Sequence, residues 1–136
     1  MDTSSAPFFG LDGLHVLSVD DDGDTLDIVR AILEDAGAVV TTAFSAREGL
    51  EMLQRERPAV LVSVIVMPTE DGFWLIAQVR GLSPAHGGRT PAAALTVLTG
   101  AADRAQILGA GFQYHIPKPI QPKKFLGIVA VLAIKE

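Results

Sequence analysis

Several side chains that could together bind a cation and a phosphoryl group lie at separate points along the sequence. Asp20 and Asp21 directly follow an apolar run. Thr96 lies near the end of another apolar run, and Lys118 follows a third. Adjacent carboxylates repel each other unless a cation lies between them, and a hard cation such as Mg²⁺ prefers oxygen ligands. Because a lysine and a hydroxyl can bind phosphoryl oxygens, this set indicates phosphoryl chemistry if the fold brings it together.

Five apolar runs alternate with five segments of helical periodicity, which predicts a strict strand–helix repeat. The expected strands are 15–19, 38–43, 59–66, 92–97 and 112–116, and the expected helices are 24–36, 45–57, 70–82, 99–109 and 122–134. Strict alternation implies a parallel sheet with helices on both faces. We therefore predict an α/β, flavodoxin-like (βα)5 three-layer sandwich of strand order 2-1-3-4-5, in which sites form beyond the carboxyl ends of the strands.

Three residues are expected to begin helices in this repeat. Asp24 and Thr99 have side chains that can cap the helices that follow them. Ser45 and Glu48 form an S-x-x-E capping box, in which each side chain bonds the other residue's backbone N–H.

Length and composition limit the organisation of the chain. Its 136 residues suit one domain, and we expect a loose leader over residues 1–13 and a folded domain over residues 14–136. A net charge of -5 argues against nucleic-acid binding. The longest apolar run, residues 125–134, is shorter than the roughly 20 residues that span a bilayer, so we expect no membrane insertion. The absence of cysteine is compatible with the expected cytoplasmic location.

Four segments together resemble the signature segments of response-regulator receiver domains of two-component (phosphorelay) systems. They are VLSVDDD (16–22), VSVIVMPTEDG (62–72), ALTV (94–97) and HIPKP (115–119). The segment GFQYHIPKP (111–119) is similar to receivers attached to hybrid histidine kinases. The resemblance extends over roughly residues 13–132. It implies a non-enzymatic signalling domain whose partner is a histidine kinase or another signalling protein.

The resemblance also implies roles for individual residues. Asp20 and Asp21 match the acidic pair that holds Mg²⁺ in the family, and Thr96 matches the hydroxyl that turns toward the phosphoryl group. Lys118 matches the lysine that pairs with the acceptor carboxylate, and the peptide bond after it is usually cis. His115 occupies the position of the switch aromatic.

The sequence departs from the family at the phospho-acceptor position, which Val64 occupies. Valine has no oxygen, so it can neither accept a phosphoryl group nor coordinate a cation. Ser63 is no substitute, because adjacent strand residues point to opposite faces. We expect Val64, Val66, Val97 and Leu98 to form an apolar lid over the acidic pair and the lysine. We expect no cofactor, at most weak Mg²⁺ binding by Asp21 and Asp20, and a lysine that pairs with one of these aspartates.

The last predicted helix has no charged residue between Phe125 and Ile134. A helix that is apolar all round is normally buried all round, whereas one side of this helix should meet water in so small a domain. An exposed apolar stripe indicates a docking surface. Its occupant could be a second copy of the chain, giving a homodimer, or a neighbouring domain of a longer protein. Trp74 is expected to pack against a neighbouring helix and to have no binding role.

Three interpretations of the acceptor position remain. The leading one is a degenerate receiver that docks to other proteins without aspartyl phosphorylation. The second is a haloacid-dehalogenase-like phosphohydrolase with Asp20 as nucleophile and Asp22 as acid, because SVDDDGDT (18–25) nearly matches that motif. The third is that valine replaces a natural aspartate, which needs one base change. The apolar residues Val66, Val97 and Leu98 favour a natural degenerate site.

Overall fold

The computed structural model of the protein describes residues 10–134 and contains five strands and five α-helices in strict alternation. Their bounds are β1 His15–Val19, α1 Gly23–Asp35, β2 Val39–Ala43, α2 Ala46–Glu56, β3 Val60–Val64, α3 Gly72–Arg80, β4 Ala92–Thr96, α4 Ala101–Ala110, β5 Tyr114–Pro117 and α5 Pro122–Ala133, with a short 3₁₀ turn at Pro84–His86. All neighbouring strands pair in parallel, in the order β2-β1-β3-β4-β5. The predicted fold and strand order are confirmed.

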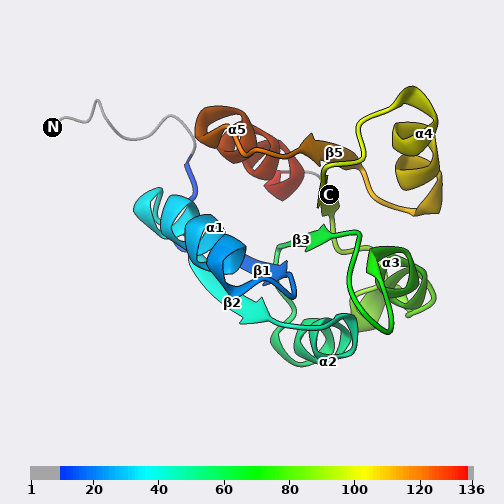
Figure 1. Ribbon diagram of the computed structural model, residues 1–136. Helices are drawn as coiled ribbons and strands as arrows, with labels where there is room; N and C mark the ends of the chain where they lie inside the picture. The colour runs from blue at the N-terminus through cyan, green and yellow to red at the C-terminus, as the bar shows by residue number, and fades with distance from the viewer. Residues whose placement is uncertain (1–9, 135–136) are drawn as a thin grey trace, which may run out of the picture.

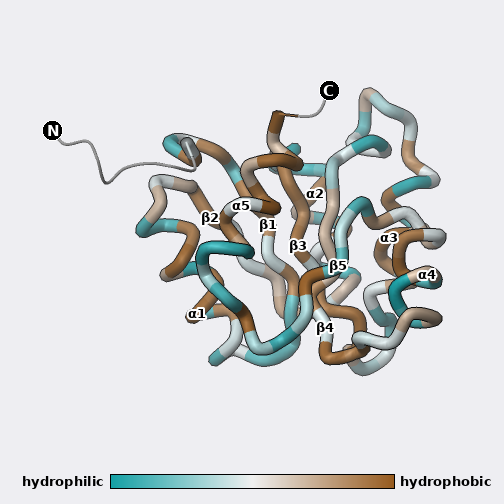
Figure 2. Tube along the Cα trace, turned by 90° about the horizontal axis from the view of Figure 1, so that it is seen from above, coloured by the Kyte–Doolittle hydropathy of each residue, from teal (hydrophilic) through white to brown (hydrophobic). Residues whose placement is uncertain are grey.

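The helices form two layers around the sheet. α1 and α5 lie together on one side, and α2, α3 and α4 lie on the other (Figure 1). Every residue of β3 and β4 is buried, as expected for central parallel strands that are covered on both faces. The tube of β3 in Figure 2 has mostly the colour of hydrophobic residues. The carboxyl ends of the five strands therefore meet along a single edge.

The folded domain begins earlier than the sequence predicted. The Leu11 side chain is only 1% exposed and belongs to the hydrophobic core. The Gly13 N–H donates to the Gly37 carbonyl at 2.9 Å. The expected leader over residues 1–13 is therefore too long at its C-terminal end, because one buried side chain anchors this segment. The rest of that leader, residues 1–9, lies outside the described residues.

The predicted capping box at the start of α2 is confirmed for the Ser45 side chain but not for the Glu48 side chain, which does not bond the Ser45 N–H. The Glu48 N–H donates to the Ser45 Oγ at 3.1 Å, and the Phe44 N–H donates to the Glu48 Oε1 at 2.7 Å. The Glu48 carboxylate thus accepts from the backbone N–H of Phe44, the residue before Ser45. These bonds fix the short connection between β2 and α2, and with it the position of Phe44.

Two other predicted caps are wrong by one or two residues. α1 is capped by Asp22, whose Oδ1 accepts from the Asp24 N–H at 3.0 Å, and Asp24 lies inside the first turn. α4 begins after Gly100, whose N–H donates to the Asp103 Oδ2 at 3.2 Å, and Thr99 precedes this cap. In both cases an acidic side chain accepts a hydrogen bond from a backbone N–H that lies two or three residues away, at the start of the helix.

The last helix exposes apolar side chains as the sequence predicted. Phe125, Val129 and Leu132 are buried against the core. Val131 is 42% exposed, and Ile134, just past the helix, is 76% exposed. A homodimer through this helix stays a prediction. Within residues 10–134, no helix is both long enough and apolar enough to cross a membrane.

Trp74 packs against the neighbouring helix, which confirms its predicted structural role. The Arg47 guanidinium of α2 lies over the Trp74 ring of α3, 5.2 Å from the ring centroid. Arg47 also pairs with Glu70, in the loop before α3, at 3.2 Å. These contacts join α2, α3 and the β3–α3 loop on one face of the sheet.

One non-glycine residue beside the site has a backbone conformation that favours glycine. Thr69, exposed in the β3–α3 loop, has a φ of 69°. For a β-branched residue this left-handed conformation is strained. We expect Thr69→Gly to raise the free energy of unfolding by about 1 kcal/mol, measured by urea denaturation. Ser45→Gly, at a residue with an ordinary extended conformation, should instead lower it. An unchanged or lower stability for Thr69→Gly would contradict the prediction.

Candidate functional site

The fold brings the predicted site residues to one edge of the sheet. Asp20 directly follows β1, Val64 ends β3, Thr96 ends β4 and Lys118 directly follows β5. Sheet-like hydrogen bonds continue past the strand ends, from the Asp20 N–H to the Ala43 carbonyl at 3.1 Å and from the Lys118 N–H to the Thr96 carbonyl at 3.0 Å. The backbone of both charged residues is therefore held by the sheet.

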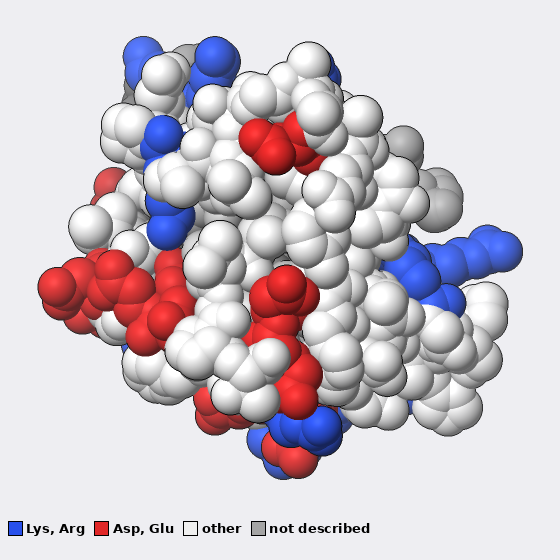
Figure 3. Space-filling view, turned by 45° about the vertical axis from the view of Figure 1, so that its right-hand side comes forward, with Lys and Arg blue, Asp and Glu red and all other residues white. Residues whose placement is uncertain are grey.

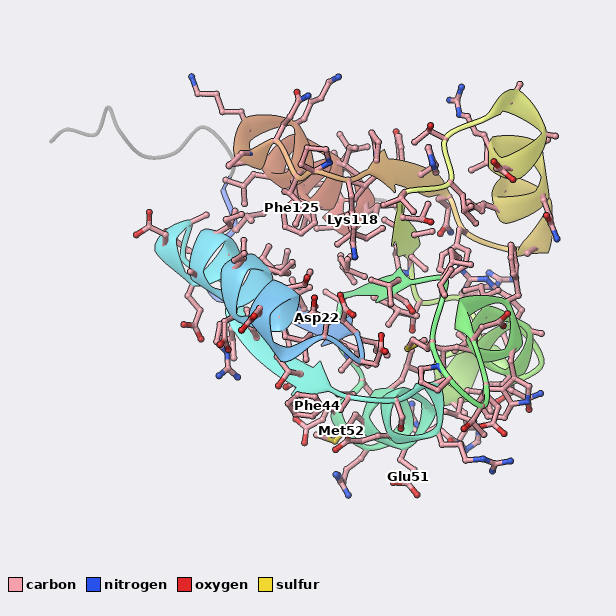
Figure 4. All side chains as sticks on the ribbon, in the orientation of Figure 1. Asp22, Phe44, Glu51, Met52, Lys118 and Phe125 are labelled. Atoms are coloured by element: carbon pink, nitrogen blue, oxygen red, sulfur yellow. The ribbon has the colours of Figure 1, made fainter. Side chains whose placement is uncertain are left out.

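Asp20 is buried and faces the Lys118 ammonium. Asp20 is 3% exposed, and its Oδ1 accepts a hydrogen bond from the Asp22 N–H at 2.9 Å. Its Oδ2 has no hydrogen-bond partner among the described residues, and the Lys118 Nζ lies 3.9 Å from it. Figure 4 shows the Lys118 side chain extending toward the β1–α1 loop that contains Asp22. Of the two aspartates predicted as partners of the lysine, the structure selects Asp20. The peptide bond after Lys118 is cis, as the resemblance implied.

The three carboxylates of the β1–α1 loop have different environments. Burial raises the pKa of Asp20, an effect that the Asp22 backbone N–H and Lys118 partly oppose. The Thr25 hydroxyl donates to the Asp22 Oδ2 at 3.0 Å, and this bond together with the Asp24 N–H lowers the pKa of Asp22. Asp21 is exposed to solvent. The loop thus combines one buried carboxylate, one helix cap and one solvated carboxylate.

Val64 fills the end of β3 with a buried apolar side chain. It is 4% exposed. The Ser63 hydroxyl donates to the Val64 carbonyl at 2.8 Å, so it is used within the strand. Gly72 packs so closely on this strand end that an added Cβ would lie 2.4 Å from the Val64 oxygen. The backbone of the β3 end is therefore tightly fixed, and its terminal side chain offers no oxygen.

Thr96 and His115 both bind the backbone of Leu98, in the β4–α4 loop. The Leu98 N–H donates to the Thr96 Oγ1 at 3.1 Å, and the His115 Nε2 lies 2.8 Å from the Leu98 carbonyl. Since a carbonyl only accepts, His115 is the donor. Sequence reasoning selected these two side chains but missed their common partner. No sequence signal identifies it, because the bonds reach backbone atoms.

The predicted apolar lid does not form. Val66 and Val97 are 68% and 67% exposed, whereas Val64 is buried and Leu98 is half-buried. The strands end at Val64 and Thr96. Val66 and Val97 therefore lie in loops, where strand alternation no longer directs their side chains toward the core. Both valines face solvent at the rim of the site.

The donor set does not fit a tightly held Mg²⁺ ion. Asp20 already faces the Lys118 ammonium, Asp21 is exposed and Val64 supplies no ligand. Across residues 10–134, no three His, Cys, Asp or Glu side chains are placed so that they could hold a metal ion together. Because Mg²⁺ demands near-ideal octahedral oxygen geometry, we assign no chemical step to a metal at this site.

Comparisons with known proteins agree with this fold. The family model of the response regulator receiver domain matches residues 16–130. An uncharacterized 14.6 kDa protein in the sodA1 3′ region of Leptolyngbya boryana is 45% identical over 116 residues, covering 85% of this chain and 87% of that protein. Response regulator MprA of Mycobacterium leprae is 32% identical, over 88% of this chain but only 50% of its own length. The chain thus spans about half of that regulator.

Solved structures give the same result. The structure of the chemotaxis protein CheY4 of Vibrio cholerae superposes with a TM-score of 0.81 at 30% identity, covering 88% of this chain and 98% of that one. A signal receiver domain of a histidine kinase from Syntrophus aciditrophicus gives 0.80 at 26% identity, covering 89% and 90%. These matches give no support to the phosphohydrolase alternative. The family match and the shared fold together establish that this chain belongs to the response regulator receiver domain family.

Proposed function

We propose that this receiver domain acts in two-component signalling as a protein-interaction domain that does not depend on aspartyl phosphorylation. Its partner would be a histidine kinase or another signalling protein in the cytoplasm. The observation that carries the proposal is Val64 at the end of β3, where the family places its acceptor aspartate. A buried valine cannot form an acyl phosphate, so signalling would depend on contact alone.

Two further observations support a site held in one conformation. The Lys118 ammonium faces Asp20 at 3.9 Å, so the cation that would otherwise bind a phosphoryl group already has a partner. Thr96 and His115 are both hydrogen-bonded to Leu98. The two residues that would move on phosphorylation are thus bound to the same loop. We therefore propose a domain whose contact surfaces are available to partner proteins at all times, without a change of conformation.

The test is a titration of Mg²⁺ and then beryllofluoride, a phosphoryl mimic, followed by amide NMR shifts. The unmodified protein should show no saturable response at the site. Val64→Asp should bind both, because it restores a third carboxylate next to Asp20 and within reach of Lys118. The shifts should centre on Asp20, Thr96 and Lys118.

Val66→Asp is the matched control for this experiment. It also adds a carboxylate near the end of β3, but at a side chain that is 68% exposed, so it should not restore binding. If the unmodified protein responds strongly to both ligands, another group completes the site and the proposal is wrong. If Val64→Asp folds with an unchanged far-UV spectrum yet binds neither ligand, an aspartate at position 64 does not complete the binding site. The assignment of Val64 to the acceptor position is then wrong.

A further inference from the structure

Strand β2 forms an open edge of the sheet. Among residues 10–134 it pairs with β1 alone, and Figure 1 shows it at the outer side of the sheet, between α1 and α2. The hydrogen bonds of the Val39 N–H and the Ala43 carbonyl point toward the β1 side. Because backbone groups alternate in direction along a strand, those of Val40 and Thr42 point away from the sheet.

The two edge strands differ in how well they resist pairing with a further strand. β5 contains Pro117, which has no N–H, and Lys118 follows it. Proline and lysine are residues by which edge strands avoid pairing. β2, with the sequence VVTTA, has neither proline nor a charged residue. Arg30 of α1 reaches over it, but its Nη2 donates to the Val40 carbonyl at a long 3.4 Å. β2 therefore keeps outward donors and acceptors that another strand could use.

A second β2 strand, antiparallel to the first about a two-fold axis at Thr41, would match these groups. Val40 of each copy would lie opposite Thr42 of the other, and residues paired in this way exchange two backbone hydrogen bonds. Val39 and Phe44, near opposite ends of the strand, are 55% and 57% exposed. Antiparallel pairing brings the Phe44 end of one strand beside the Val39 end of the other. Both ends of the contact would therefore cover apolar side chains that one copy leaves exposed.

Asp27 and Arg30 of α1 supply opposite charges beside this contact. Gly23 lies near the end of β2, since a Cβ added there would be 3.8 Å from the Phe44 ring. Arg30 reaches Val40. Asp27 is exposed and lies four residues after Gly23 and three before Arg30, which places it on the same stripe of the helix. The two-fold axis would pass between these two levels, and it would place Asp27 of one copy beside Arg30 of the other.

Long-range charge opposes contact between two copies, because the net charge of the chain is -5. In Figure 3, acidic side chains form clusters within a largely uncharged face, and the basic side chains lie mostly toward its margins. A contact between copies must therefore place opposite charges together, as Asp27 and Arg30 would at two symmetric positions. The Glu34 carboxylate faces the Arg30 Nε at 3.6 Å, so the Nη groups can turn to the second copy.

We infer that two copies of this chain associate through antiparallel pairing of their β2 strands, with Val40 opposite Thr42 and with Asp27 beside Arg30 across the two-fold axis. This inference goes beyond the proposed function and does not depend on it, because the acceptor site takes no part in the contact. The surface on β2 is also distinct from the α5 surface predicted from the sequence. The contact is confined to one strand and one helix, so we expect a weak dimer that forms at high protein concentration.

Sedimentation equilibrium over a concentration series tests the inference. The mass of the unmodified protein should rise with concentration from 14.4 kDa toward twice that value. Asp27→Arg alone places arginine against arginine, and Arg30→Asp alone places aspartate against aspartate, so each variant should associate roughly tenfold more weakly. An equimolar mixture of the two variants should recover the affinity, since each copy of one variant then meets opposite charges of the other at both positions.

Asp35→Arg is the matched control, because it makes the same change of charge at an exposed residue of α1 that lies off the stripe of Asp27 and Arg30. It should not weaken association. Thr42→Pro removes an outward N–H and should weaken association at least tenfold with an unchanged far-UV spectrum. A monomer at every concentration, equal weakening by Asp27→Arg and Asp35→Arg, no recovery in the mixture, or a dimer that Val131→Ser weakens instead would overturn the inference.

Discussion

Arg80→Met should lower the free energy of unfolding by about 3 kcal/mol, one of the two largest effects that we expect. The Arg80 guanidinium, at the end of α3, donates to the carbonyls of Gly111, Gly88 and Thr90 and to the Gln113 side chain, at 2.8–3.2 Å. It thus joins three segments of the chain, and burial lowers its pKa. Hydrogen bonds to a charged group are worth roughly 1.5–3 kcal/mol each in favourable cases, and buried acceptors left unpaired add to the loss.

Urea denaturation at pH 7 measures this effect. Arg55→Met is the matched control, because Arg55 is exposed on α2 and its ion pair with Glu56 is long, at 4.0 Å. Such surface pairs contribute little, so this change should stay within about 0.5 kcal/mol. Arg80→Lys should recover only part of the lost stability, since an ammonium cannot reproduce the planar five-donor fork. Equal losses for Arg80→Met and Arg55→Met would show that the guanidinium contacts are not stabilising.

Asp20→Asn should raise stability at neutral pH by roughly 1–2 kcal/mol, since it removes a carboxylate charge that is buried away from water. Burial raises the pKa of Asp20 in the folded state above the ordinary value of 3.8. Between these two pKa values the folded protein binds more protons than the unfolded chain, so stability falls as pH rises through this window. Asp20 therefore destabilises the fold above its folded pKa and has no such effect below 3.8.

The gain from Asp20→Asn should accordingly be present at pH 7 and should vanish below about pH 3.8, which urea denaturation at several pH values would measure. Asparagine keeps the acceptor for the Asp22 N–H, so the loop should retain its shape. Asp21→Asn is the control, because Asp21 is exposed, and its effect should be small at both pH values. A variant that is less stable at pH 7 than the unmodified protein would mean that the Lys118 contact outweighs the cost of burial.

The sequence was sufficient to predict the topology and the residues at the sheet edge. Strict alternation of apolar runs and helical periodicity implied the parallel order, and that order alone brings Asp20, Thr96 and Lys118 together. The motif spacing also placed Val64 at the end of β3. These properties depend on hydrophobic patterning along the chain, which a single sequence displays directly.

What the sequence could not predict depends on loop geometry and on backbone partners. The exposure of Val66 and Val97 was missed because strand alternation stops at the strand ends, one or two residues before them. The Arg80 contacts and the shared Leu98 partner involve carbonyl or N–H groups that every residue possesses. The burial of Leu11 was also missed, because no sequence motif marks the point at which the chain enters the folded domain. Apolar patterning predicts the helices and strands, whereas these contacts and exposures follow only from the three-dimensional structure.

The stacking of Arg47 on Trp74 determines what optical spectroscopy can detect in this protein. Trp74 is the single tryptophan of the chain, so its emission reports the packing of α2 against α3. It does not directly monitor Asp20 or Lys118, which lie at the ends of other elements. A silent fluorescence trace during a ligand titration would therefore show only that the α2–α3 contact is undisturbed, whereas quenching would signal a rearrangement transmitted to the helical layer.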